Sequence, residues 1–261
     1  MISKDLLSYK TTDALSARIA LYKNIVGSIW LNKLVEYLHG FEGMEILDAG
    51  CGNGEIAKDV LEACPRAHLV GVDRSSALLD EARARCKGMS ADFIEADLME
   101  FASEKAFDRI LLCHTLHLLK DPVNALSYIL SLAKPEGFCV LTVHSDEDFP
   151  KRREWIKWFE QTCAKTYSAS RDALTIEKWK EIFGDRFAPS QQEVVTSMVH
   201  LSDPQPYLAY IQTERHRFTP EPTEEEWQAY LAHAEDEIKK DIDRQGFFEE
   251  PHVIGILVVT K

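Results

Sequence analysis

The sequence predicts an α/β protein with a mostly parallel sheet that is covered by helices on both faces. Over residues 43–143, short apolar segments alternate with helical segments, which is the pattern of consecutive β-α-β units. Several of these apolar segments, such as 44–49 and 107–113, are mostly hydrophobic, as expected for strands buried on both sides. Glycines cluster directly after the first apolar segment, where such a sheet turns into its first helix.

The elements follow in a regular order. Apolar side chains recur at helical spacing over residues 13–38. Strands are expected at 44–49, 67–72, 92–96, 107–113 and 138–143, and helices at 55–64, 75–86 and 121–133, the last one ending at the turn 134–137. A helical stretch at 150–186, a strand at 193–201, helical segments at 204–216 and 223–245 and a closing strand at 252–260 complete the chain.

Composition excludes several classes of function. The 261-residue chain has a formal net charge of −13, which disfavours nucleic acid as a partner because phosphate contacts require a basic surface. The chain contains no run of about 18 apolar residues, so no membrane span is predicted. The first residues lack the layout of a secretory signal, and the six cysteines have no metal-ligand spacing. We therefore expect a cytoplasmic protein without membrane insertion or a metal; the sequence does not indicate an oligomeric state.

The most specific motif is an apolar strand that runs into a glycine-rich turn and then a helix. The turn has the pattern G-x-G-x-G at Gly50, Gly52 and Gly54, and Asp48 precedes it. A dinucleotide site would read G-x-G-x-x-G/A, but Glu55 occupies its last position and would repel a pyrophosphate. A ligand that carries an ammonium and a sulfonium fits two nearby carboxylates better.

From Asp48 to Gly54 the chain resembles class I S-adenosylmethionine-dependent methyltransferases, and further landmarks follow in the family's order. Acidic residues close the second and third strands at Asp73 and Asp97. The segments 107–122 and 132–138 match the family's fourth and fifth motifs, with Glu136-Gly137 where many relatives have two glycines. The small-molecule branch typified by ubiquinone and menaquinone biosynthesis methyltransferases looks most similar.

The resemblance implies a Rossmann-like, doubly wound fold with seven strands and a helical lid inserted after the fifth strand. It implies that Asp73 holds the ribose hydroxyls and that Asp97 and Leu98 face the adenine. Tyr9 and Arg18 lie where relatives fold a helix over the cofactor, and Arg18 is either a ligand of the cofactor carboxylate or a solvated side chain. The expected cofactor-binding set is Asp48, Gly50, Cys51, Gly52, Gly54, Asp73, Arg74, Asp97, Leu98, Cys113, Tyr9 and Arg18.

Three histidines are candidates for a general base, because they follow the strands whose ends lie next to the substrate. His144 follows the fifth strand, and His117 and His114 follow the fourth; we rank them in that order. Catalysis by positioning alone, without a base, is the alternative.

We expect one domain over residues 1–261. It comprises an N-terminal helical cover (1–42), a cofactor-binding core (43–144), a helical lid or substrate region with strand six (145–250) and the last strand (251–261). The predicted reaction is transfer of a methyl group from S-adenosylmethionine to a small molecule, with S-adenosylhomocysteine as product. The acidic chain favours an acceptor that is neutral or cationic near the reacting atom, but oxygen, nitrogen, carbon and sulfur acceptors stay open. An S-adenosylmethionine-binding protein with non-methylating chemistry or a lost activity is one alternative, and a nicotinamide-dependent oxidoreductase is a weaker one.

Overall fold

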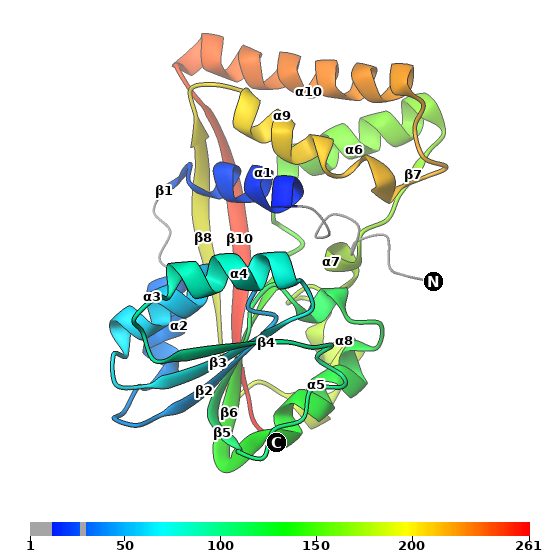
Figure 1. Cartoon of the computed structure of the whole chain (residues 1–261). Helices are drawn as coiled ribbons and strands as arrows, with labels where there is room; N and C mark the ends of the chain where they lie inside the picture. Colours follow the sequence, from blue (N-terminus) through cyan, green and yellow to red (C-terminus); the bar gives the residue numbers. More distant parts are fainter. Residues whose placement is uncertain (1–11, 27–29) are drawn as a thin grey trace. The chain divides into compact units, whose positions relative to one another are not determined.

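The computed structural model describes residues 12–26 and 30–261, and its contacts divide the chain into two compact units (Figure 1). The core unit comprises Ile29–His144, Leu174–Val195 and Ile254–Lys261. The helical unit comprises Met1–Ser28, Ser145–Ala173 and Thr196–Val253. The single domain expected from the sequence stays a prediction.

The core unit contains a mostly parallel sheet, as predicted. Its strands are β2 (Glu45–Ala49), β3 (His68–Asp73), β4 (Ala91–Glu95), β5 (Phe107–Leu112) and β6 (Ala133–His144), together with parts of β8 (Gln191–Leu201) and β10 (Phe248–Val259). Strands β2 to β6 are parallel, and β10 is antiparallel to β6. The order of the whole sheet is β1-β8-β10-β6-β5-β2-β3-β4, so the chain reverses its direction of winding between β2 and β5. Ligands bind at such a switch point in open α/β sheets.

Over the described residues, the sheet has eight strands rather than the seven predicted. The additional strand is the two-residue β1 (Ile25–Val26), which pairs with β8 through Ile25↔Val199 and Val26↔Met198 in the helical unit. Residues 13–38 are therefore not one helical stretch but α1 (Thr12–Tyr22), β1 and α2 (Trp30–Leu38). The β-branched pair 25–26 satisfies its backbone in a ladder, and helical periodicity on either side does not reveal that pairing.

Helices cover both faces of the sheet. Leu47, Ile110 and Leu141 pack with α5 (Pro122–Ser131) and α8 (Trp179–Phe183) on one face. Their strand neighbours Ile46 and Leu111 pack with α2 and α3 (Glu55–Ala63) on the other. This alternation follows from the two-residue period of a strand and confirms the predicted burial on both sides. Helix α4 (Ser76–Arg85) completes the predicted series.

Strand β6 begins earlier than expected. The segment 134–137, predicted as a turn, belongs to the strand, and the β5–β6 register shifts beside it, between Phe107 and Arg109. Gly137 permits this approach, because a Cβ there would lie 2.7 Å from the Phe107 carbonyl oxygen. The preceding helix α5 ends at Ser131.

The helical unit contains α1, α6 (Pro150–Cys163), α7 (Ser170–Ala173), α9 (Gln205–Gln212) and α10 (Glu224–Gln245), with the short pair β7 (Thr166–Tyr167) and β9 (Phe218–Thr219). Its core is aromatic and includes Trp155, Phe159, Tyr207 and Trp227. The helical stretch expected at 150–186 is interrupted after α6, where Ala164 has a left-handed backbone with φ of 52°. Among the described residues, no helix combines the length and apolar character that a membrane span requires.

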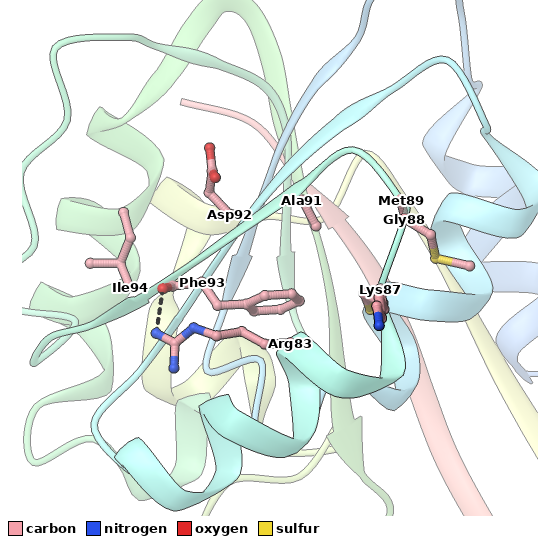
Figure 2. A pocket seen from close by; sticks show the side chains of 9 residues that line it. Arg83, Lys87, Gly88, Met89, Ala91, Asp92, Phe93 and Ile94 are labelled. Carbon is pink, nitrogen blue, oxygen red and sulfur yellow. Dashed lines mark hydrogen bonds between the residues drawn. The ribbon is translucent and has the colours of Figure 1, made fainter.

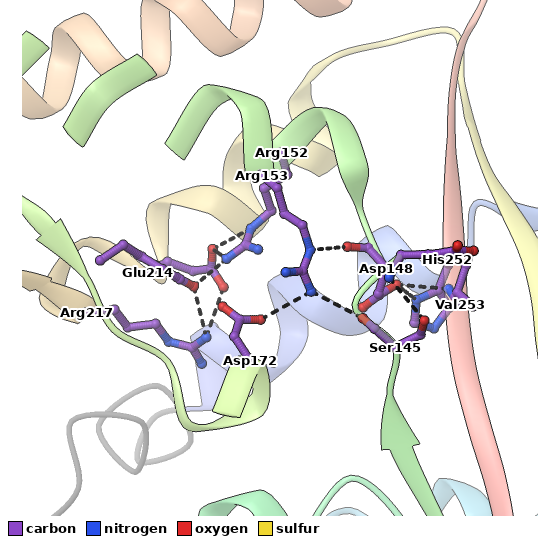
Figure 3. A network of polar contacts seen from close by, with 11 residues as sticks. Ser145, Asp148, Arg152, Arg153, Asp172, Glu214, Arg217, His252 and Val253 are labelled. Carbon is purple, nitrogen blue, oxygen red and sulfur yellow. Dashed lines mark hydrogen bonds and ion pairs between the residues drawn. The ribbon is translucent and has the colours of Figure 1, made fainter. Parts of the chain in front are cut away.

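A network of buried charges connects segments within the helical unit (Figure 3). Arg152 and Arg217 are each 1% exposed, and both contact the carboxylate of Glu214. Asp148 accepts a hydrogen bond from the Val253 backbone and contacts the His252 ring, both at 2.9 Å. Pairing offsets much of the cost of burying these charges, and the contacts of Arg152 with Glu214 and of Asp148 with Val253 join segments that are distant in the sequence.

Candidate functional site

The glycine-rich turn connects β2 to α3 at the carboxyl edge of the sheet. Gly50, Gly52 and Gly54 all have positive φ, at 84°, 52° and 75°. A Cβ on Gly50 would collide with the Thr115 side chain, and one on Gly54 would lie 2.8 Å from the Ala82 Cβ. A Cβ on Gly52 would meet no atom within 4 Å. Two of the glycines therefore allow close packing, and the third leaves an open side where a ligand can approach the backbone.

Asp48 lies beneath this turn as a buried carboxylate. It is 1% exposed, and its Oδ2 has no hydrogen-bond partner among the residues that the structure describes. Burial, followed by the nearby negative charge of Asp73, raises the pKa of Asp48 from 3.8 to about 7. An unsatisfied carboxylate is unfavourable, and a cationic ligand group would relieve the cost.

Asp73 connects the end of β3 to the turn. Its Oδ2 accepts a hydrogen bond from the Gly52 backbone at 3.0 Å, and its Oδ1 accepts one from the Ser75 backbone at 2.9 Å. Ser75 caps α4 by accepting a hydrogen bond from the Leu78 backbone. A carboxylate has about four lone-pair positions, so Asp73 retains capacity for a ligand's hydroxyl groups.

Asp97 and Arg74 form an ion pair between the chain segments that follow β4 and β3. Arg74 Nη2 donates to Asp97 Oδ2 at 2.8 Å, and the Met99 backbone donates to Asp97 Oδ1 at 2.9 Å. Leu98, which follows Asp97, is 8% exposed. The structure therefore groups Asp73, Arg74 and Asp97 at one edge of the sheet, as their positions after successive parallel strands predict.

The turn after β5 carries two of the candidate histidines. His114 has a left-handed backbone with φ of 52°, which is uncommon for a residue with a side chain. Its backbone nitrogen donates to Thr142 Oγ1 at 3.0 Å, and Thr115 Oγ1 donates to the Cys113 carbonyl at 2.9 Å. Burial raises the pKa of the Cys113 thiol well above its ordinary value, so this thiol is unreactive.

The three histidine rings come together. The His144 ring centroid lies 5.4 Å from that of His117 and 5.7 Å from that of His114. His144 ends β6, and His117 lies in the 3-10 turn η2 (Leu116–Leu118). Because Thr115 packs against Gly50, the turn that carries His114 and His117 contacts the glycine-rich turn.

The remaining residues of the predicted set lie in different parts of the chain. Cys51 is 8% exposed, and burial raises the pKa of its thiol. Arg18 lies in the helical unit, with its guanidinium carbon 5.6 Å from the centroid of the Tyr210 ring. Tyr9 lies outside the described residues. Thr115 and Thr142 were not predicted, because their roles depend on contacts with turns that are distant along the chain.

A separate hollow of about 530 Å³ lies beside β4 (Figure 2). Arg83, Lys87, Met89 and Phe93 are among its lining residues, and Arg83 donates to the Phe93 carbonyl at 2.8 Å. None of its lining residues belongs to the predicted cofactor set, so we do not assign the hollow to the cofactor. In the described part of the chain, no group of three His, Cys, Asp or Glu side chains is arranged for a metal ion.

The family model of the methyltransferase domain matches residues 41–201 of the chain. This chain belongs to the methyltransferase domain family. The match covers the glycine-rich turn, both acidic strand ends and all three candidate histidines, and it confirms the family predicted from the motifs.

Curated relatives of this methyltransferase domain include the trans-aconitate 2-methyltransferase of Enterobacter sp. (strain 638). It is 34% identical over 106 residues, a stretch that covers 41% of each of the two chains. Solved structures with the same fold include S-adenosylmethionine-dependent methyltransferases from Thiobacillus denitrificans and Geobacter sulfurreducens, both in complex with S-adenosylhomocysteine. Their TM-scores are 0.56 and 0.54 at 16% and 14% identity; each match covers 88% of this chain, and 90% and 89% of theirs. They confirm the predicted Rossmann-like α/β fold.

Proposed function

We propose that this chain transfers a methyl group from S-adenosylmethionine to a small-molecule acceptor by in-line displacement. The observation that carries the proposal is the contact of Thr115 with Gly50, which joins the glycine-rich turn to the histidine turn at the sheet's switch point. A cofactor site and candidate acid–base groups thus lie next to each other in one part of the sheet.

The residues of the turn suit S-adenosylmethionine. The buried Oδ2 of Asp48, which lacks a hydrogen-bond partner among the described residues, would face the cofactor's ammonium, directly or through water. Asp73 would accept from the ribose hydroxyls while its bonds to Gly52 and Ser75 hold it in place. Asp97 and Leu98, with Arg74 paired to Asp97, would border the adenine. When bound, this cofactor supplies an electrophilic methyl group on a sulfonium.

For an acceptor that must lose a proton, we propose His144 as the general base. Its ring centroid lies 5.4 Å from that of His117 and 5.7 Å from that of His114, so it is the neighbour that the other two candidates share. His144 is 5% exposed, which shelters a proton transfer from water. Catalysis by positioning alone is the alternative and predicts no effect when the imidazole is removed.

The chemical nature of the ligand distinguishes this proposal from the alternatives. Glu55 is the first residue of α3, where a dinucleotide's pyrophosphate would need positive potential. Its carboxylate therefore disfavours binding of a nicotinamide dinucleotide.

The relatives named for trans-aconitate provide one acceptor to test, although the aligned stretch covers 41% of their length. The absence of nucleic acid partners and the cytoplasmic location stay predictions.

Calorimetry with S-adenosylhomocysteine and NADH tests the cofactor. We expect micromolar binding of S-adenosylhomocysteine and no measurable binding of NADH; tighter binding of NADH would reject the proposal. Transfer of tritium from methyl-labelled S-adenosylmethionine to trans-aconitate, a metabolite library, tRNA and DNA then tests the acceptor class. Binding without transfer to any acceptor would favour a cofactor-binding protein that has lost its activity, and strong labelling of nucleic acid would reject a small-molecule acceptor.

A further inference from the structure

Thr175 lies next to His144 at the carboxyl end of β6. Thr175 is the partner of His144 in an isolated parallel bridge, and the Ile176 backbone donates to the His144 carbonyl at 2.9 Å. Residues paired across a bridge project their side chains to the same face of the sheet. The Thr175 side chain therefore lies on the face where the His144 imidazole meets the rings of His114 and His117.

Thr175 is unusual among the polar residues of the core unit. It is 0% exposed, and its Oγ1 has no hydrogen-bond partner among the residues that the structure describes. A buried hydroxyl without a partner is unfavourable, and a valine would fill the same space without that cost. A group of this kind beside a proposed active site is explained when a ligand supplies the missing partner.

We propose that the Thr175 hydroxyl binds the oxygen atom of the acceptor that receives the methyl group, so that this protein methylates oxygen. This inference rests on the proposed function and narrows its substrate class. The four side chains gathered here are three imidazoles and a hydroxyl, which can all donate hydrogen bonds to an oxygen. None of the four has a negative charge, so these side chains offer no counter-ion to an acceptor with a cationic group near the reacting atom.

Two kinds of oxygen acceptor share this chemistry. In both, an oxygen lone pair forms the new O–CH₃ bond, and the S–CH₃ bond breaks with its electron pair staying on sulfur. A hydroxyl acceptor also loses a proton, which passes to His144. A carboxylate has no proton to lose, so its methylation would depend on Thr175 but not on the basicity of His144.

The first test uses Thr175→Val, which keeps the shape and removes the hydroxyl, and Thr175→Ser, which keeps the hydroxyl. In the ligand-free protein, we expect the urea midpoint of Thr175→Val to equal or exceed that of the wild type, because an unsatisfied group is removed. S-adenosylhomocysteine affinity should be the same in all three proteins. A crystal structure of the S-adenosylhomocysteine complex should show a water or acceptor oxygen within about 3.2 Å of Thr175 Oγ1.

The second test measures transfer from methyl-tritiated S-adenosylmethionine to trans-aconitate, as a carboxylate probe, and to catechol, as a hydroxyl probe. For the probe that is methylated, Thr175→Val should lower kcat/KM at least about tenfold, mainly through KM, and Thr175→Ser should stay within about threefold of the wild type. If neither probe is methylated, the crystal structure of the complex decides.

Three results would overturn the inference. They are a lowered urea midpoint for Thr175→Val, a complex with no oxygen near Thr175 Oγ1, and unchanged transfer by Thr175→Val. Failure of the wild type to bind S-adenosylhomocysteine would reject the proposed function and this inference with it. Normal binding of S-adenosylhomocysteine with any of the three results rejects the inference alone.

Discussion

Replacement of Asp48 by asparagine should make the ligand-free protein more stable at alkaline pH and change how its stability depends on pH. The carboxylate is 1% exposed, and its Oδ2 has no hydrogen-bond partner among the described residues. Burial and then the charge of Asp73 raise the pKa of Asp48 from 3.8 to about 7. The folded state thus binds a proton more tightly than the unfolded chain does.

The size of the expected change in the free energy of unfolding follows from the raised pKa of Asp48. A difference of about 3 pKa units corresponds to roughly 4 kcal/mol between the two protonation states, at about 1.4 kcal/mol per unit. Because the folded-state pKa of Asp48 is raised, this group contributes most to the free energy of unfolding below pH 3.8. That contribution falls as the pH rises and is lost as the pH passes through about 7. Between about pH 5 and pH 8 the wild type should lose about 3 kcal/mol through this group, and Asp48→Asn should not.

Urea unfolding from about pH 5 to pH 8 measures the effect in the wild type, in Asp48→Asn and in the control Asp80→Asn. The Asp80 side chain is 77% exposed, and its replacement should leave the pH dependence unchanged. Burial also raises the pKa of Glu250 to about 7, but this contribution is common to all three proteins and cancels in the comparison. If the wild type and Asp48→Asn lose the same stability over this range, the buried carboxylate does not titrate there and the reasoning is refuted.

The other predictions concern ligand binding and catalysis. Asp73→Ala removes an acceptor of two backbone hydrogen bonds and of the proposed ribose bonds, so S-adenosylhomocysteine affinity measured by calorimetry should fall by about 2–4 kcal/mol, with Asp80→Ala unaffected. Gly52→Val should abolish this binding, whereas Gly43→Val, which introduces a side chain at a φ of 75° with open space around it, should preserve it; equal losses would mean that backbone strain alone is responsible. His144→Asn should slow single-turnover transfer to a hydroxyl acceptor at least about a hundredfold without changing cofactor affinity, and a rate within about threefold of the wild type from about pH 6 to pH 9 would support catalysis by positioning.

Much of the fold could be predicted because the signals are local. The strands at 45–49 and 107–112 are mostly apolar runs, and the helix at 224–245 is bounded by a capping box at Thr223 and by Gly246. The predicted borders of these elements agree with the structure within one residue. The glycine-rich turn and the acidic residues that close β3 and follow β4 were also predictable, because backbone geometry and charge favour those residue types at those positions.

The tertiary structure decided what depends on residues far apart in the sequence. The segment Leu174–Val195 lies within the region 145–250 that was predicted as a helical lid or substrate region with strand six, and its contacts place it in the core unit. The reason is that Trp179 and Phe183 pack in the same apolar cluster as the strand residue Ile110, whereas the helical unit has an aromatic core of its own. The strand β1 exists only through its pairing with β8.

The same distinction holds for the candidate site. The sequence by itself determined the glycine-rich turn, the carboxylates and the three histidines, since each is attached to the end of a predictable strand. Only the tertiary structure showed that Thr115 contacts Gly50 and that Thr175 pairs with His144. The role of a single threonine cannot be predicted from a local sequence pattern, because it depends on whether the hydroxyl is buried and on which residues surround it in the folded protein.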